Sequence, residues 1–411
     1  MKEETIEKRD KNVPVNVLYS FPHKIGAGGI CYSAEQQVRA LSEVGANVTV
    51  ITGVLHKPLP DNVKVLTTLS WGKLRISYKL FGTMRALSLH DHIVAKKVLK
   101  EKNKYDIIHV WPSAALETIR AANSIGTPTV LERPNAHTRY AYESVQNESK
   151  RLGIPLPPQN EYSLKKKKDV LEREEEEFRL SYRIVCPSEF TRKSFLDQGY
   201  APEKLVRHFR GVDDKRYYPG KSATVKRRDF TMLFVGACAV RKGVHFALEA
   251  WLQSPAHRNG TFMIVGEFLP AYAEKLSEML SHPSVKVLGH RSDVPELMRK
   301  SDILVLPSIE EGFGKVCTEA MCSGCVPLVS EACTDICRHM ENALVHRIGD
   351  VKTLQEHITT LYEDRTLLRN LRTQGLQTVP MITWGSASKR LIQVYREVID
   401  DYKKEVPIQD R

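Results

Sequence analysis

The sequence lacks an apolar run of about 18 residues, so we expect no helix that spans a membrane. Its first segment, residues 1–12, is charged and lacks the apolar stretch of a secretory signal, which favours a protein that stays in the cytoplasm. Because no export signal accompanies the eight cysteines, we expect these residues to be thiols and not disulfides.

Two motifs of nucleotide binding are also absent. The sequence has no G-x-G-x-x-G followed by an acidic residue at the end of the second strand, which disfavours a nicotinamide enzyme. It has no G-x-x-x-x-G-K-[ST], which disfavours a P-loop NTPase. No recognised nucleic-acid-binding module is present either, so we do not expect a nucleic-acid partner.

What is present is the composition of an ordinary globular protein. The 411 residues are 42% apolar and 27% charged, which fits two or three domains. Lys and Arg number 61 against 49 Asp and Glu, a net charge of +12. This excess attracts polyanions, anionic membranes and phosphorylated small molecules, but it also fits a surface that only confers solubility.

Short β-branched runs alternate with stretches of helical periodicity, which predicts an α/β protein with parallel sheets. The predicted strands are 13–20, 47–52, 106–111, 127–131, 183–187, 230–236, 261–266, 285–288, 302–307 and 326–330. Residues 33–45 and 243–252 are typical of helices. The polar, basic stretch 219–229 is interpreted as a linker between two units of similar size.

Two charged segments stand out. Residues 163–180 hold blocks of Lys and Glu at helical spacing, which we interpret as an exposed, solvated helix. Residues 71–104 carry nine Lys or Arg against two Asp or Glu, interleaved with aromatic and aliphatic residues. This second segment is a candidate for a membrane-surface or acceptor-binding region, although a basic face of packed helices is at least as good an interpretation.

Three predicted strand ends carry candidate site residues, since ligands of open α/β sheets bind there. The loop Gly26–Gly29 lets backbone N–H groups approach a phosphate, but alone it is a weak signal. In Glu310–Glu319, the carboxylates of Glu311 and Glu319, with seven residues between them, could bind pairs of sugar hydroxyls, or could be a helix cap and a surface residue. In Phe234–Gly243, the adjacent Arg241 and Lys242 could neutralise a diphosphate, or could simply be exposed.

Together these segments resemble GT-B glycosyltransferases of retaining family 4, the group 1 transferases. Glu311–Glu319 resembles the E-x7-E signature of that family, and Ala320–Ser330 is similar to its usual continuation. Phe234–Gly243 resembles the donor-phosphate segment, Gly211–Asp213 resembles the turn into the second domain, and Gly26–Gly29 resembles the N-terminal glycine loop. The similarity is strong over residues 230–350 and weaker in the N-terminal half.

The resemblance implies a fold of two Rossmann-like domains with parallel sheets that face a central cleft. Residues 1–208 would bind the acceptor, residues 209–383 would bind the nucleotide sugar, and residues 384–411 would form a helix that crosses back to the N-terminal domain. No D-x-D triplet is present, so a metal-bridged diphosphate is not indicated and we expect neither a metal nor another cofactor.

The resemblance also implies a site. Glu319 would contact the ribose, Lys242 and Arg241 the diphosphate, and Glu311 the donor sugar, together with backbone of the glycine-rich loop. The full donor-binding set is Gly28, Gly29, Gly236, Arg241, Lys242, Glu311, Gly312, Phe313, Gly314, Lys315, Val316 and Glu319. The catalytic residues would be Glu311, Lys242 and His137.

His137 is chosen because it follows the predicted strand 127–131, with Arg133 and Asn135 as neighbours, although a lone histidine is more often structural. The sequence departs from the family at Ala237, where an arginine is usual. Either Arg241 replaces that charge or the phosphate has one cation fewer. Cys322, Cys325, Cys333 and Cys337 could form a zinc site, but buried thiols that fill the core are the favoured interpretation.

The resulting prediction is a metal-independent, retaining hexosyltransferase that moves a sugar from a UDP- or GDP-sugar to a hydroxyl. The acceptor would be a glycan, a lipid-linked molecule or a small molecule, in polysaccharide, glycolipid or other glycan synthesis. A membrane-associated acceptor, reached by peripheral contact with the cytoplasmic face of a membrane, is favoured by residues 71–104. The alternative function is a non-catalytic GT-B protein that binds a nucleotide sugar or a glycan.

Overall fold

The computed structural model describes residues 13–71, 74–75, 81–154, 168–220 and 229–405. The chain forms two compact units. The first consists of residues 1–132, 176–183 and 388–411, and the second of residues 133–175 and 184–387. The predicted domain boundaries, after residues 208 and 383, stay a prediction.

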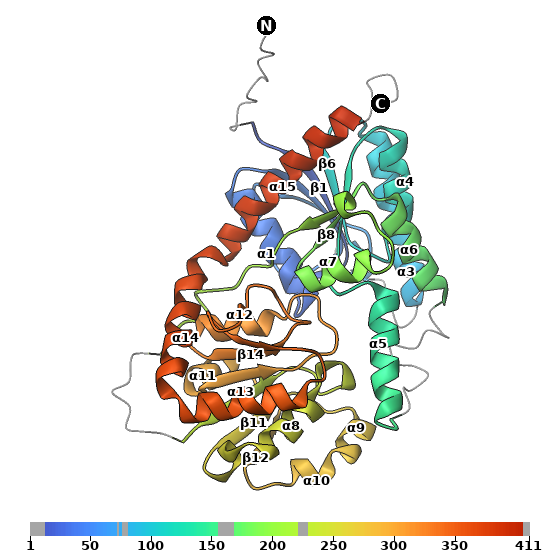
Figure 1. The fold of residues 1–411 in the computed structure, drawn as a ribbon. Coiled ribbons are helices and arrows are strands. Elements are labelled where there is room, and N and C mark those ends of the chain that lie inside the picture. The colour runs from blue at the N-terminus through green and yellow to red at the C-terminus, as the bar shows by residue number, and fades with distance from the viewer. Residues whose placement is uncertain (1–12, 72–73, 76–80, 155–167, 221–228, 406–411) are drawn as a thin grey trace, which may run out of the picture. The chain divides into compact units, whose positions relative to one another are not determined.

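The first unit is built around parallel strands in the order β3-β2-β1-β6-β7, of which Figure 1 labels β1 and β6. Their bounds are β1 Asn16–Ile25, β2 Asn47–Leu55, β3 Lys64–Thr67, β6 Ile107–Val110 and β7 Thr129–Glu132. The short strands β4 (Ser70–Trp71) and β5 (Leu74–Arg75) form an antiparallel pair. Every residue of β6 and β7 is buried, as expected for strands that are covered on both faces.

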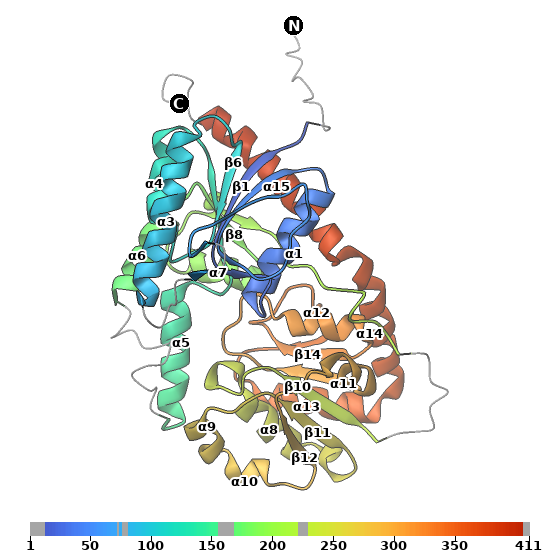
Figure 2. The same cartoon turned by 180° about the vertical axis from the view of Figure 1, so that it is seen from behind.

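The helices of the first unit are α1 (Ile30–Glu43), α3 (Thr83–Lys100) and α4 (Leu116–Ser124), with α3 and α4 side by side (Figure 2). Helix α4 begins where two buried carboxylates satisfy its first N–H groups. Asp91 accepts from Glu117 and Thr118, each at 2.9 Å. Glu177 accepts from Ser113 at 2.7 Å and from Ala115 at 2.9 Å.

Glu177 belongs to helix α6 (Lys168–Leu180), and its position corrects the interpretation of residues 163–180. The interpretation as an exposed, solvated helix is wrong in part, because Glu177 is 0% exposed and Glu174 is 7% exposed. The carboxylate of Glu174 accepts from the Thr138 hydroxyl at 2.5 Å. The Lys and Glu pattern could not distinguish carboxylates that cap other helices from carboxylates that face water. Residues 155–167 lie outside the described part of the chain.

The second unit contains a six-stranded parallel sheet in the order β12-β11-β10-β13-β14-β15. Its strands are β10 Thr231–Val235, β11 Thr261–Val265, β12 Val285–Gly289, β13 Ile303–Leu306, β14 Val326–Ser330 and β15 Leu344–His346. Helices α8 (Val244–Gln253) and α13 (Val351–Glu363) cover one face, and α11 (Val294–Lys300) and α12 (Lys315–Cys322) cover the other (Figures 1 and 2). The apolar core therefore divides into two clusters, one on each face of the sheet.

The second unit also holds several shorter or peripheral elements. They are α5 Thr138–Arg151, β8 Arg183–Cys186, α7 Glu189–Leu196, η2 Pro202–Lys204, β9 Leu205–Arg207, η3 Val240–Lys242, η4 Pro255–Arg258, α9 Pro270–Lys275, α10 Ser277–Leu280, α14 Arg365–Thr378 and η5 Val379–Met381. Strand β8 pairs in parallel with β9. The last helix, α15 (Trp384–Glu405), passes into the first unit at Ser388. Within that unit, Tyr395 of α15 hydrogen-bonds the buried His109 at 2.7 Å.

Strands β10 and β13 bring the charged segments Phe234–Gly243 and Glu310–Glu319 to the same edge of the sheet. They are adjacent and parallel, so the residues that follow each strand emerge together. Gly243 ends the segment after β10 at φ 66°, and a Cβ there would lie 2.0 Å from the carbonyl oxygen of Pro307 after β13. Glycine is therefore required for the two strand ends to approach this closely.

The alternation of strands and helices predicted from the sequence is confirmed. Each predicted strand coincides with an observed one, while the short strands β3, β4, β5, β9 and β15 were missed. All eight cysteines are free, and every one except the half-buried Cys31 is buried. Most of the predicted linker, residues 221–228, lies outside the described part of the chain. Within the described residues, the structure contains no helix long and apolar enough to cross a membrane.

Candidate active site

The acidic loop, residues 310–314, lies after β13 and leads into helix α12. Gly314 ends it with φ 68°, a left-handed conformation that favours glycine. Glu311 is 7% exposed in this loop. Its carboxylate contacts the Nζ of Lys242 directly and lies 3.5 Å from the Nη1 of Arg241. The structure therefore brings together the carboxylate and the two cations that the sequence placed on separate strand ends.

The charge of Glu311 follows from these neighbours. Burial alone would raise the pKa of Glu311, but the charges of Lys242 and Arg241 outweigh burial and lower this pKa to about 2. Hydrogen bonds from Lys242 and from the backbone of Gly312 act in the same direction. The carboxylate is therefore ionised at neutral pH and can stabilise positive charge that develops beside it.

Arg241 is held by the residue before Glu311. Its Nη1 donates to the carbonyl oxygen of Glu310 at 3.0 Å and lies 3.4 Å from the Oε2 of Glu310, which is fully buried. The side chains of Arg241 and Lys242 are 18% and 12% exposed. The alternative in which this pair is simply solvent-exposed is therefore wrong. The sequence had not singled out the role of Glu310.

The second carboxylate, Glu319, lies in helix α12 beside Tyr217. Burial raises the pKa of Glu319, while the charges of Lys315 and Arg216 and a hydrogen bond with Tyr217 act against that rise. Burial and the neighbouring Glu319 raise the pKa of Tyr217, so its hydroxyl stays protonated. Burial lowers the pKa of Lys315. Tyr217 and Arg216 were missed, and the signal for them was the turn Gly211–Asp213, which ends three residues before Arg216.

His137 is the N-cap residue of helix α5. Its ring is 1% exposed and packs against Phe195 and Tyr200, with centroid distances of 4.8 and 5.5 Å. Burial, followed by the charges of Arg133 and Arg139, lowers the pKa of His137 to about 3, so the ring is neutral at pH 7. Its predicted role at the reacting centre stays a prediction.

The segment just before His137 contacts the acidic loop. The N–H of Ala136 donates to Glu310 Oε1 at 3.0 Å. The guanidinium of Arg133 donates to the carbonyl oxygen of Ala136 at 3.1 and 2.7 Å. A Cβ on Gly312 would lie 1.7 Å from the carbonyl oxygen of Pro134. Two of the predicted segments, 133–137 and 310–314, thus pack directly against each other.

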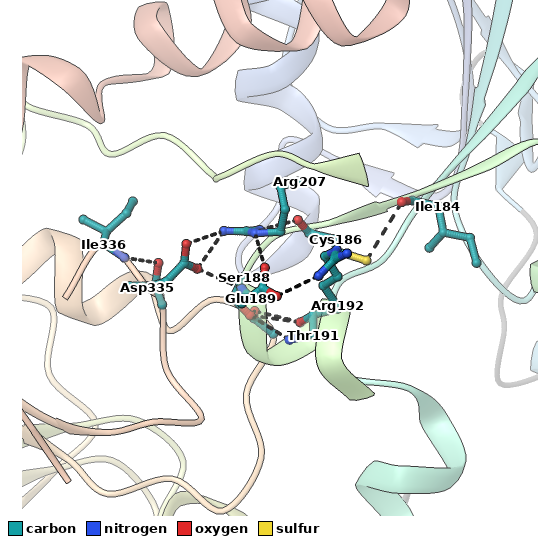
Figure 3. A network of polar contacts seen from close by, with 11 residues as sticks. Ile184, Cys186, Ser188, Glu189, Thr191, Arg192, Arg207, Asp335 and Ile336 are labelled. Carbon is teal, nitrogen blue, oxygen red and sulfur yellow. Dashed lines mark hydrogen bonds and ion pairs between the residues drawn. The ribbon is translucent and has the colours of Figure 1, made fainter. Parts of the chain in front are cut away.

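A polar network fixes the start of helix α7 to the loop that follows β14 (Figure 3). Asp335 accepts from the backbone N–H of Glu189 at 2.8 Å and from Arg207 Nη2 at 2.6 and 2.8 Å. Arg207 Nη1 donates to the carbonyl oxygen of Cys186 at 2.5 Å. The carboxylate of Asp335 therefore lies at the positive end of α7 and also pairs with a cation.

The remaining predicted residues lie in three places. Gly236 directly follows β10, and a Cβ on Gly266 would lie 1.8 Å from the carbonyl oxygen of Gly236. Phe313 is 2% exposed, and Val316 packs against the core of the second unit. Gly28 and Gly29 belong to the first unit, where they are exposed just before helix α1. The roles of all five in donor binding stay predictions.

The cysteines near the acidic loop are buried and protonated. Burial and contact with Cys317 raise the pKa of Cys333, and Cys317 interacts with both Cys333 and Cys337. Burial raises the pKa of Cys322 to about 12. In the described ranges, no group of three or more His, Cys, Asp or Glu residues is arranged to hold a metal ion.

Two family models match the chain. The model of glycosyl transferases group 1 matches residues 229–364, which contain the acidic loop and the Arg241–Lys242 pair. The model of glycosyltransferase family 4 matches residues 27–216, which contain His137. The matches cover both the N-terminal and the C-terminal halves of the chain.

Individual relatives have modest identity. The N,N'-diacetylbacillosaminyl-diphospho-undecaprenol alpha-1,3-N-acetylgalactosaminyltransferase of Campylobacter jejuni is 27% identical over 245 residues, which are 54% of this chain. The UDP-Gal:alpha-D-GlcNAc-diphosphoundecaprenol alpha-1,3-galactosyltransferase of Escherichia coli is 25% identical over 280 residues, 66% of this chain and 70% of that protein. The chain spans 62% of the length of the Campylobacter protein.

Solved structures extend the similarity to nearly the whole chain. The crystal structure of Anabaena HepE in complex with UDP has a TM-score of 0.63 at 16% identity, covering 93% of this chain and all of that one. At this identity the likeness is evidence for the fold, which is GT-B with two parallel sheets, as predicted. The family models and the fold agree, and the chain belongs to the group 1, family 4 glycosyltransferases.

Proposed function

We propose that this protein transfers a sugar from a nucleotide-diphosphate sugar to a hydroxyl acceptor with retention of configuration and without a metal ion. The observation that carries the proposal is the buried Glu311 carboxylate, kept ionised by Lys242 and Arg241 at the start of helix α12. A negative charge beside the donor sugar stabilises the oxocarbenium-like transition state, and two cations stabilise the leaving diphosphate.

The diphosphate would bind between the two cations and the N-terminus of α12. The helix dipole and the N–H groups of a glycine-rich turn both favour an anion at this place. Lys242 pairs with Glu311, and Arg241 pairs with Glu310. A bound diphosphate would draw Lys242 into a shared position between phosphate and carboxylate. Lys242 would then contact both the leaving diphosphate and the Glu311 carboxylate, which faces the donor sugar.

The ribose would bind Glu319, whose carboxylate accepts hydrogen bonds from pairs of hydroxyls. The Tyr217 hydroxyl hydrogen-bonds this carboxylate. Burial raises the pKa of Glu319, and hydrogen bonds to a carboxylate that is partly shielded from water are stronger than those made in bulk water. The neighbouring charges of Lys315 and Arg216 favour the ionised form that a diol needs as its acceptor.

His137 would orient the sugar or acceptor hydroxyls through a neutral ring. Its pKa of about 3 makes it a poor proton donor at pH 7 but leaves it able to hydrogen-bond in either direction. Retention then proceeds by front-face transfer, in which the leaving phosphate receives the acceptor proton. Glu311 acts electrostatically in this scheme and does not form a covalent intermediate.

The acceptor would be presented at an anionic membrane surface. Two of the relatives are named for transfer to diphospho-undecaprenol acceptors. In this chain, helix α3 exposes Met84 and Leu99, 36% and 51%, together with Arg85, Lys96 and Lys100. A helix with exposed apolar and basic residues is suited to anionic headgroups. The rest of the basic segment, residues 72–73 and 76–80, lies outside the described part of the chain.

The test is a panel of UDP, GDP, ADP and TDP and their common sugars, read by thermal shift and by release of nucleoside diphosphate. A ligand at about 100 times its Kd adds about 2.7 kcal/mol to the unfolding free energy. Lys242→Ala and Glu319→Gln should lose the shift, and the exposed Lys275→Ala should keep it. No shift with any nucleotide would contradict the proposal, and binding without turnover in any acceptor extract would favour the non-catalytic alternative.

A further inference from the structure

The first turn of helix α7 holds the carbonyl oxygen of Gly312, the residue that follows Glu311. The Ser188 hydroxyl donates to this oxygen at 2.6 Å, and the Thr191 hydroxyl donates to it at 3.0 Å. Both side chains are fully buried. Two donors on one carbonyl use both of its lone pairs, so the orientation of this peptide is defined from the α7 side.

The other side of Gly312 is equally confined. A Cβ at this position would lie 1.7 Å from the carbonyl oxygen of Pro134 and 2.9 Å from the Cα of Asn135. Two residues earlier, the carboxylate of Glu310 accepts from the N–H of Ala136 at 3.0 Å. The peptide between Gly312 and Phe313 therefore lies between two segments and cannot rotate without breaking one of these contacts.

Helix α7 is itself fixed independently of the acidic loop. Ser188 is its N-cap residue, and its side-chain oxygen accepts from the Thr191 N–H at 3.1 Å. Asp335 binds the Glu189 N–H and Arg207 at the same helix end (Figure 3). The two hydroxyls are thus presented to Gly312 from a rigid support and not from a mobile loop.

The orientation of this peptide has a chemical consequence. In a trans peptide the C=O and the following N–H point in opposite directions. Because the Gly312 carbonyl points to α7, the Phe313 N–H points away from α7. We infer that Ser188 and Thr191 are positioning residues of the transferase reaction. They direct the Phe313 N–H toward the bound donor and fix the backbone that carries Glu311, an inference that rests on the proposed function.

Thr191→Val tests this inference with little change in shape. Valine keeps the branched side chain and the backbone N–H that the cap uses, and removes only the hydroxyl that donates to Gly312. Thr191→Ser restores the hydroxyl. The matched control is Thr378→Val in α14, where the lost hydroxyl accepts from Asn342 at 3.2 Å and donates to Gln374 at 2.9 Å. All four proteins are compared with the donor that the nucleotide panel identifies.

Two readouts are needed. Removal of an oxyanion donor costs about 10²–10³ in kcat, so misdirection of one donor by Thr191→Val should lower kcat by about tenfold, with the donor KM within about threefold. Hydrogen–deuterium exchange of the peptide that covers residues 310–316 should become faster in Thr191→Val. Thr191→Ser should restore both quantities, and Thr378→Val should change neither, although it lowers the Tm.

The outcomes separate this inference from the proposed function. A wild-type protein without turnover, combined with faster exchange only in Thr191→Val, would contradict the transferase proposal and support the positioning of the loop. An active wild type with unchanged kcat and exchange in Thr191→Val would overturn the inference. So would an equal loss of kcat in Thr378→Val, or a failure of Thr191→Ser to recover.

Discussion

Replacement of Gly243 by alanine should damage both the stability of the second unit and its candidate site. Gly243 has φ 66°, and an added Cβ would lie 2.0 Å from the Pro307 carbonyl oxygen and 2.9 Å from its carbonyl carbon. Both atoms are backbone, so the clash cannot be relieved by a rotamer change. The carbonyl lies at the end of β13, three residues before Glu310, and Gly243 directly follows Lys242.

A matched glycine, Gly289, separates the cost of the left-handed backbone conformation from the cost of the clash. Gly289 has φ 62°, and a Cβ there would have no neighbour within 4 Å. A left-handed alanine costs about 1–2 kcal/mol, partly offset by about 0.4–1 kcal/mol from the stiffer unfolded chain, so Gly289→Ala should lose about 1 kcal/mol. Gly243→Ala adds an overpacking cost of about 1–3 kcal/mol, for a total of about 2–4 kcal/mol.

The assay is thermal unfolding of both variants with and without the identified nucleoside diphosphate. At about 2–4 °C per kcal/mol, Gly243→Ala should unfold about 4–16 °C below the wild type, and Gly289→Ala only about 2–4 °C below it. Gly243→Ala should also lose the ligand-induced shift, because Lys242 moves relative to Glu311. Equal Tm values for the two variants would refute the reasoning, since backbone conformation alone would then explain both.

Three further predictions concern pH, metal and helix capping. Burial, followed by neighbouring histidines, lowers the pKa of His346 to about 3 and of His357 to about 4. Below pH 6.5 these two histidines therefore bind more protons in the unfolded chain than in the folded one, and above that pH their contribution to the free energy of unfolding should be constant. It should fall on acidification by up to about 1.4 kcal/mol per pH unit for each histidine, as Tm measured across pH 4–8 would check. Transfer activity should survive EDTA, and a loss that Mg²⁺ or Mn²⁺ restores would show that the metal-free proposal is wrong. Glu177→Gln should lower the Tm, since an amide has one acceptor oxygen for the two N–H groups of Ser113 and Ala115, whereas the exposed Glu172→Gln should leave the Tm unchanged.

The sequence predicted the fold well because its central strands are short, β-branched and buried on both faces. The strands it missed are two to four residues long, such as β9 and β15, and only their neighbours in the sheet make them strands. Glu311 and Lys242 could be predicted because each follows a recognisable strand directly. The direct contact between their side chains could not, since it depends on the pairing of β10 with β13.

Other site features escaped prediction for a related reason. Ser188 and Thr191 reach Gly312 from 124 and 121 positions away in the sequence, and nothing local to either segment indicates that contact. Glu310 looked equivalent to Glu311, yet one carboxylate binds Ala136 and the other contacts Lys242. Adjacent side chains in a loop point in different directions, and only the backbone conformation decides which partner each one meets.

The distribution of the cysteines makes the protein suited to site-selective labelling. Seven thiols are buried, and Cys31 alone is half-buried, in helix α1 just after the exposed Gly28 and Gly29. Burial raises the pKa of Cys31, so a maleimide dye should be coupled at mildly alkaline pH, where more thiolate is present. Without any engineered substitution, a single fluorophore would then report events at the glycine loop while the core thiols stay unmodified.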